Sequence, residues 1–344
     1  MAERIGKNTL LTTSCPSIIG YAAVGSKMEK EGPLGGFFDC LNEDSSFGEK
    51  TWEKAEISMQ QQAISAALGK SSLHKNQVDF LFAGDLLNQC IASAYSSRST
   101  QIPFIGLYGA CSTMAESLAL SGMFVDSSLA NHCLAVTSSH FCTAERQFRL
   151  PLEYGGQRPP TSQWTVTGSG ACVVAPKSKP PYLRAVTFGT VEDLGINDIN
   201  NMGAAMAPAA ARTLIEFFRD THFNPKDFDL ILTGDLGLVG SRLFLRLMEE
   251  KGYHLDNHND CGLMIYDREK QDVQSGGSGC GCCACALCSF ILPQIACQRL
   301  KNVLFIATGA LMSPTSIQQG ESIPGIAHLI YLSAFSDEQK KEES

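Results

Sequence analysis

The sequence predicts an α/β protein in which two similar halves stack sheet against sheet, and two observations support this. Residues 78–87 (VDFLFAGDLL) and 228–237 (FDLILTGDLG) both form an apolar strand that runs into Gly-Asp-Leu. A helical pattern of apolar and small residues precedes each strand, at residues 51–69 and 201–220. Segments that recur with the same neighbours indicate a duplicated unit. We therefore expect one β/α unit in each half of the chain.

The remaining elements of the two halves also match in order. Each half continues with a Gly-rich turn that opens a helix of small residues, followed by two buried strands. These segments are 109–125, 131–140 and 168–175 in the first half, and 276–292, 301–310 and 324–332 in the second. Alternating strands and helices predict mostly parallel sheets covered on both faces, with the small-residue helices between the sheets. Ligands of such sheets bind beyond the carboxyl ends of the strands.

A Pro/Lys-rich stretch at residues 176–183 (PKSKPPYL) separates the two sets of elements. Proline and flanking polar residues favour a connecting segment at such a position. We therefore predict an N-terminal half at 1–177, a C-terminal half at 178–335 and a charged tail at 336–344.

Composition narrows the class of protein. Of 344 residues, 44% are hydrophobic and 18% are charged, which is typical of a globular chain. The net charge of -8 without a basic block argues against nucleic-acid binding. The chain has neither a signal-peptide pattern at its start nor a run of about 20 apolar residues, so we expect an intracellular protein. Its 14 cysteines lie mainly in apolar or Gly/Ala-rich stretches, which favours buried, reduced thiols.

Cys111 is the first candidate site residue, because the motif Gly-Ala-Cys at 109–111 lies where a strand meets a small-residue helix. Free backbone N–H groups and the helix dipole at such a junction lower the pKa of a thiol and attract anions. The alternative is a small buried hydrophobic residue. We expect Cys111 to face a pocket.

Several long segments resemble a known family. They are 14–39 (SCPSIIGYAAVGSKMEKEGPLGGFFD), 82–120 (beginning FAGDLLNQC and containing GACS), 148–171, 274–284 (QSGGSGCGCCA) and 305–332. The chain resembles the thiolase superfamily and, more narrowly, the stage V sporulation protein AD family. The resemblance implies a thiolase-like αβαβα fold and a homodimer that binds pyridine-2,6-dicarboxylate (dipicolinate). It also implies that the protein lies at the inner membrane of the developing spore and assists dipicolinate uptake there with membrane channel proteins.

The same resemblance raises an alternative, because the position of Cys111 is the acylated nucleophile in thiolase-superfamily enzymes. Condensing enzymes of that superfamily supply His and Asn, or two His, from their second half. Here the corresponding segments read Thr-Gly-Asp at 233–235 and Gly-Gly-Ser at 276–278, so both expected side chains are missing. His140 ends a first-half strand and could approach Cys111. An acyltransferase that forms an acyl-enzyme on Cys111 therefore stays open, as does a purely structural partner of membrane proteins.

Asp85 and Asp235 occupy equivalent strand ends and are candidates for the ligand site. Two carboxylates would repel a dianion unless they are protonated, paired with a cationic side chain or bridged by a cation. Carboxylate oxygens suit calcium, which could therefore accompany the ligand, although no resident cofactor or metal is predicted. Turn capping is the alternative role.

A dicarboxylate also needs hydrogen-bond donors. Arginine matches a carboxylate in a bidentate fork, and Arg149 is the preferred candidate. Gly277 and Ser278, in a Gly-Gly-Ser-Gly turn, can bring backbone N–H groups close to an anion. The other arginines considered are Arg98, Arg146 and Arg158.

Two further clusters suggest metals at first sight. The cysteines at 280–288 form one apolar helical stripe rather than two separated zinc knuckles, which predicts a buried helix. His254, Asp256, His258 and Asp260 lie in a stretch that reads as a polar surface loop, and we predict no metal there.

Overall fold

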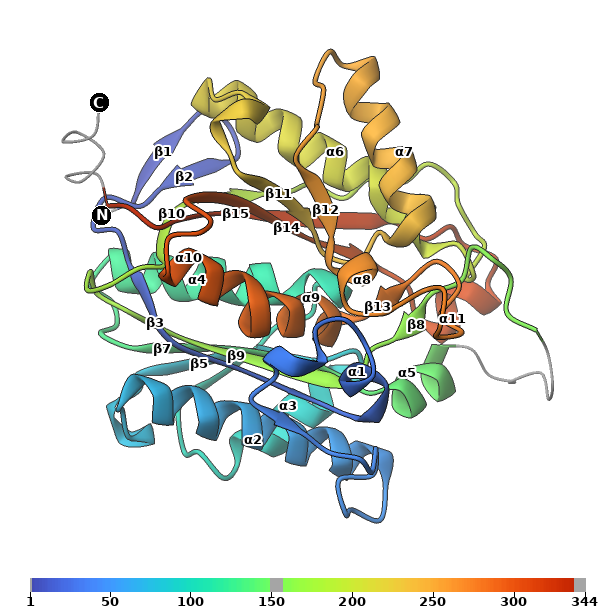
Figure 1. The fold of residues 1–344 in the computed structure, drawn as a ribbon, viewed down its shortest axis with the longest axis horizontal. Helices are drawn as coiled ribbons and strands as arrows, with labels where there is room; N and C mark the ends of the chain where they lie inside the picture. The colour runs from blue at the N-terminus through green and yellow to red at the C-terminus, as the bar shows by residue number, and fades with distance from the viewer. Residues whose placement is uncertain (1, 149–156, 337–344) are drawn as a thin grey trace.

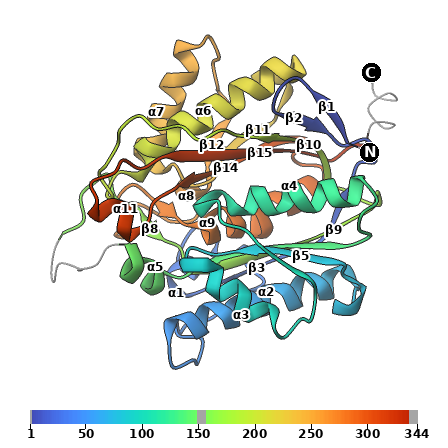
Figure 2. The ribbon, with the colours of Figure 1, turned by 180° about the vertical axis from the view of Figure 1, so that it is seen from behind.

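The computed structural model describes residues 2–148 and 157–336, which form five layers (Figure 1). From one face to the other, helices alternate with sheets in the order αβαβα, as predicted. The outer layers contain α2 (Trp52–Ser71) and α3 (Ile91–Ser97) on one side, and α6 (Met202–Thr221) and α7 (Gly237–Glu250) on the other. Seen from behind, α4 (Thr113–Asp126) runs between the two sheets (Figure 2).

Each half contributes one sheet of five principal strands in an equivalent order. The first sheet is β3 (Ser17–Gly25), β9 (Gly168–Ala175), β7 (Cys133–Ser139), β5 (Phe80–Gly84) and β6 (Phe104–Gly106). The second is β10 (Tyr182–Phe188), β15 (Gly325–Ser333), β14 (Asn302–Ala310), β11 (Leu230–Thr233) and β12 (His258–Asp260). The sheets touch where β10 pairs with β3 through Tyr182 and Ser17.

The prediction of mostly parallel sheets is wrong, because both sheets are mixed. In the first sheet β5 is parallel to β6 and β7, whereas β9 is antiparallel to β7 and β3. The second sheet repeats this pattern, with β11 parallel to its neighbours and β15 antiparallel to its own. The chain leaves β7 through α5 (Phe141–Phe148) and returns in the opposite direction, which the alternation of elements did not reveal.

The small residues at 280–286 form a helix in the middle layer, where close packing requires small side chains. The predicted buried helix is confirmed: every residue of α9 (Cys280–Ala286) is buried, and a π-helical turn, η6 (Leu287–Ile291), leads into α10 (Leu292–Ala296). A Cβ atom on Gly170 of β9 would lie only 2.6 Å from the backbone oxygen of Ala284. Glycine at this position therefore lets the helix pack directly on the sheet.

Short elements complete the fold. They are β1 (Glu3–Ile5), β2 (Thr9–Leu11), α1 (Lys27–Lys30), β4 (Cys40–Leu41), β8 (Trp164–Thr165), α8 (Cys261–Met264), β13 (Gly277–Ser278) and α11 (Pro314–Gln318). Although β2 lies at the start of the chain, it pairs with β10 of the second sheet.

The division of the chain into two halves at residue 177 stays a prediction. No helix in 2–148 or 157–336 combines the length and apolar character needed to cross a bilayer.

Candidate functional site

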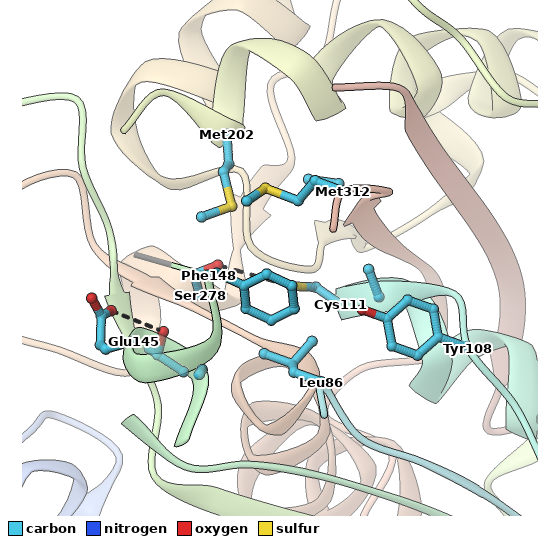
Figure 3. A pocket seen from close by; sticks show the side chains of 12 residues that line it. Leu86, Tyr108, Cys111, Glu145, Phe148, Met202, Ser278 and Met312 are labelled. Atoms are coloured by element: carbon cyan, nitrogen blue, oxygen red, sulfur yellow. Dashed lines mark hydrogen bonds between the residues drawn. The ribbon is translucent and has the colours of Figure 1, made fainter. Parts of the chain in front are cut away.

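A small cavity lies at the seam between the two halves, near the carboxyl ends of β5, β6 and β14 (Figure 3). Both halves contribute side chains to its wall. The first half supplies Leu86, Tyr108, Cys111, Glu145 and Phe148, and the second supplies Met202, Ser278 and Met312. Its volume is about 40 Å³, which leaves room for only a few waters, since one water occupies roughly 10–15 Å³ of such space.

Cys111 faces this cavity, as predicted from the Gly-Ala-Cys motif. It lies in a short 3-10 turn (Ala110–Ser112) that opens α4, and its side chain is 5% exposed. Ala110 adopts a left-handed φ of 49°, which turns the chain sharply and directs Cys111 out of the helix mouth. The Cys111 sulfur lies 3.9 Å from the hydroxyl oxygen of Ser278.

Asp235 holds this part of the wall from behind. One carboxylate oxygen accepts hydrogen bonds from the Ser278 hydroxyl (2.8 Å) and the Gly279 N–H (2.9 Å). The other accepts from the Thr308 hydroxyl at 2.8 Å. Asp235 is fully buried and does not line the cavity itself. It therefore acts on the cavity through Ser278, whose position in β13 it fixes.

The environment of Cys111 differs from the expectation of an activated thiol. Burial raises its pKa well above the ordinary value, and the negative charge of Asp235 and its hydrogen bond with the thiol raise it further. These effects outweigh the dipole of the helix that begins at Thr113, because the thiol is desolvated and faces a carboxylate. The geometry thus favours a neutral thiol that donates a hydrogen bond over a thiolate nucleophile.

The structure does not bring His140 to Cys111. Its Nε2 lies 2.8 Å from the carbonyl oxygen of Ser45, while its Nδ1 accepts a hydrogen bond from the N–H of Cys142 at 3.1 Å. This pair of contacts fixes a neutral imidazole with the proton on Nε2, and burial lowers its pKa. Neither ring nitrogen is available to take a proton from Cys111.

Asp85 also lies away from the cavity and caps the turn that follows β5. One oxygen accepts from the N–H of Leu87 (2.9 Å), and the other accepts from the N–H and hydroxyl of Ser93 (2.8 and 2.6 Å). The turn-capping alternative therefore describes the geometry of Asp85. Its neighbour Leu86 is the residue that reaches the cavity.

Among the candidate arginines in the described part of the chain, Arg158 approaches the cavity most closely. Its guanidinium pairs at 3.0 Å with the carboxylate of Glu145, a cavity-wall residue. Arg146 pairs instead with Glu53, and Arg98 lies over the ring of Tyr95. Arg149 lies outside the described residues.

The sequence argument missed the other wall residues, which are Leu86, Tyr108, Ala110, Ala144, Glu145, Phe148, Thr165, Met202, Ala310 and Met312. No pattern in the sequence marked Met312, which lies two residues after the end of β14. Glu145 and Phe148 lie three residues apart and therefore share a face of α5. That spacing by itself does not distinguish a cavity wall from packed core. Gly277, which we predicted to line the site, is buried beside Ser278 in β13.

Within residues 2–148 and 157–336, no group of three or more His, Cys, Asp or Glu side chains could hold a metal ion. His254 and Asp256 form an exposed pair at 2.8 Å. The prediction of a surface loop is wrong for His258 and Asp260, which belong to strand β12. The buried carboxylate of Asp260 accepts backbone N–H groups at the start of α7, which is a structural role.

The fold is similar to that of ketosynthases and related enzymes. 3-Oxoacyl-[acyl-carrier-protein] synthase III from Aquifex aeolicus VF5 superimposes with a TM-score of 0.58 at 13% identity, covering 92% of this chain and 99% of that one. Cerulenin-bound OleA from Xanthomonas campestris gives a TM-score of 0.60 at 12% identity, covering 96% and 98%. Likeness at this identity shows the fold alone, which is the thiolase-like fold expected from the sequence.

Closer similarity identifies the family. The chain is 48% identical over 307 residues to stage V sporulation protein AD of Bacillus subtilis (strain 168), covering 89% of this chain and 90% of that protein. The model of the stage V sporulation protein AD (SpoVAD) family matches residues 6–333. This chain therefore belongs to the stage V sporulation protein AD family.

Proposed function

We propose that this sporulation protein binds dipicolinate in the cavity beside Cys111 and assists its uptake into the developing spore. The observation that carries the proposal is the composition of the cavity wall. Apolar side chains, among them Phe148 and Met312, can cover the faces of an aromatic ring. Cys111 and Ser278 lie at its edge and would donate hydrogen bonds to the ligand by turning from Asp235, to which the Ser278 hydroxyl donates in the empty protein. The charge of Arg158 lies directly behind the wall.

The cavity must widen to admit an aromatic dicarboxylate, because small-molecule sites usually span about 300–1,000 Å³. The residues around it suit such a change. Met202 and Met312 are unbranched and adapt their shape easily. Phe148 packs against the small apolar cluster that contains Cys111 and Leu86, and it is itself only half-buried. Rotation of Phe148 and the two methionines would enlarge the cavity without moving either sheet.

Membership of a sporulation protein family supports the biological setting of the proposal. We infer that the protein acts as a homodimer at the inner membrane of the developing spore, beside membrane proteins that form the uptake channel. Calcium would enter as a companion of dipicolinate rather than as a resident metal.

The acyltransferase alternative is less well supported by the same geometry. The raised pKa of Cys111 keeps the thiol protonated, and His140 directs both ring nitrogens elsewhere. Intact-mass measurement after incubation with acyl thioesters separates the two functions. The binding function predicts no mass increase on Cys111, whereas a stoichiometric adduct there would favour the acyltransferase.

Isothermal titration calorimetry with dipicolinate tests the proposed function directly. We expect saturable binding by the unmodified protein and a loss of about tenfold to a hundredfold in affinity for Ser278→Ala, since a hydrogen bond to a charged group contributes about 1.5–3 kcal/mol. Ser46→Ala is the matched control, because Ser46 also donates to a carboxylate, that of Asp44, but at the protein surface. Absence of any binding heat from the unmodified protein would refute the proposal.

A further inference from the structure

The cavity wall carries a carboxylate at a place where an anionic ligand would meet it. Glu145 lines the cavity, and its side chain is only 3% exposed. One of its oxygens lies 3.0 Å from a terminal nitrogen of Arg158, and the other accepts a long hydrogen bond from the Thr165 hydroxyl at 3.4 Å. A carboxylate of the ligand that entered beside Glu145 would be repelled by it unless Glu145 moved.

Arg158 is held independently of Glu145. A second terminal nitrogen donates to the carbonyl oxygen of Gln163 at 3.1 Å. The guanidinium also lies 4.9 Å from the ring of Trp164 and 5.2 Å from that of Phe141. These two rings stack on each other at 4.0 Å, so they form a firm support for a planar cation. The charge of Arg158 would therefore stay in place if Glu145 left it.

We propose that Glu145 occupies, in the empty protein, the place on Arg158 that a carboxylate of the ligand takes when it binds. This inference rests on the proposed function and adds a specificity determinant to it. The exchange replaces one charge-assisted ion pair with another, so Arg158 is never left without a carboxylate. It also selects against neutral ligands, which can neither displace Glu145 nor compensate Arg158.

The position of Glu145 on α5 connects this exchange with the widening of the cavity. Phe148 lies three residues later on the same face of α5, and it packs on the cluster that contains Cys111. A shift confined to the last turn of α5, which leaves Phe141 beside Arg158, withdraws Glu145 from Arg158 and Phe148 from the cavity together. Exchange of carboxylates and opening of the site are then one movement.

Calorimetry with Glu145→Gln tests the proposal, because the two possible roles of Glu145 predict opposite changes in the affinity for dipicolinate. If Glu145 stands in for the ligand, its neutral isostere removes the competitor, and dipicolinate affinity rises about tenfold. If Glu145 only supports the wall, affinity falls. Arg158→Gln should lose tenfold or more. Glu53→Gln, which breaks the Arg146–Glu53 pair between α2 and the same helix α5, is the matched control and should leave affinity unchanged.

A second titration needs no variant and applies even if Glu145→Gln folds poorly. Pyridine-2,6-dicarboxamide has the same shape as dipicolinate but no charge, so the unmodified protein should bind it at least tenfold more weakly. Equal affinity for the two compounds, or weaker dipicolinate binding by a folded Glu145→Gln protein, overturns the exchange while the proposed function stands. Failure of the unmodified protein to bind dipicolinate overturns both.

Discussion

At the scale of single residues, the decisive feature is that Cys111 faces the cavity without the electrostatics of an activated thiol. The turn at Ala110 and the opening of α4 present the thiol to the cavity, but the group that contacts the thiol is the carboxylate of Asp235 rather than an imidazole. Because the anion beside it disfavours a thiolate, Cys111 donates hydrogen bonds better than it attacks carbonyl carbon.

This predicts slow alkylation of Cys111. In native protein near pH 8, iodoacetamide should modify the exposed thiols of Cys40 and Cys297 well before Cys111, as followed by peptide mass spectrometry. Asp235→Asn removes the charge that raises the pKa of Cys111, so we expect its alkylation to accelerate several-fold. The surface variant Asp267→Asn should not change the rate. Alkylation of Cys111 ahead of Cys297 in the unmodified protein would contradict this account.

At the scale of elements, sequence periodicity and repetition predicted the helices α2, α4, α6 and α9 and the inner strands, but not the helices α3, α5 and α7. The segments at 51–69, 168–175 and 301–310 correspond to α2, β9 and β14. The N-terminal strand β3 was not assigned, because the repeated helix and strand pattern that defined the two halves begins only at residue 51, after β3. The directions of the strands were not predicted either, because a buried apolar strand has the same sequence pattern whether its neighbours are parallel or antiparallel.

The packing of α9 on β9 provides a prediction at this scale. In Gly170→Ala the new methyl group meets the backbone of Ala284, and neither element can move without disturbing the middle layer. We expect a loss of about 1–3 kcal/mol in unfolding free energy, measured by urea denaturation. Gly69→Ala in α2 is the matched control: a Cβ there meets nothing within 4 Å, and alanine should stabilise the helix by about 0.5–1 kcal/mol.

At the scale of the whole molecule, duplication places equivalent segments of the two halves opposite each other, and this explains which site residues were predictable. Cys111 lies in the turn that opens the inner helix of the first half, and Ser278 lies two residues before the inner helix of the second, so both meet at the seam. Asp85 and His140 were less predictable, because a strand end directs successive residues to different sides. At β5 the neighbour Leu86 faces the cavity while Asp85 turns inward.

The whole molecule also buries several carboxyl groups. Desolvation is the largest cause of the raised pKa values of Glu29, Glu56, Asp85, Asp235 and Asp260. For Glu56, burial and the nearby charge of Asp85 raise the pKa from 4.5 to about 8, and for Asp260 burial raises it from 3.8 to about 7. Between the unfolded and folded pKa values, the folded protein holds a proton that the unfolded chain has released. These groups therefore reduce stability as pH rises through that window.

Buried histidines act in the opposite direction and at lower pH. Burial lowers the pKa of His258 and of His328 from 6.5 to about 4, so the unfolded chain binds protons there that the folded protein does not. Their contribution to stability is complete above pH 6.5 and is lost as pH falls toward 4. Below pH 6.5 the carboxyl and histidine effects oppose each other, whereas above it only the carboxyl effect remains.

We therefore predict that the unfolding free energy decreases as pH rises from 6.5 to 8. The decrease should be about 1.4 kcal/mol per pH unit for each proton that the folded protein still holds and the unfolded chain has released. Urea denaturation at fixed ionic strength across this range measures the slope. Glu56→Gln keeps the shape of the side chain, and its one amide oxygen can accept from either Ser138 or Thr143 while its NH2 group faces the other hydroxyl. The amide has no proton to lose in this pH range, so the slope of this variant should be shallower. Glu250→Gln, at the surface of α7, should retain the slope of the unmodified protein. A stability that stays level or rises from pH 6.5 to 8 would mean that these buried carboxyl groups are stabilised as anions.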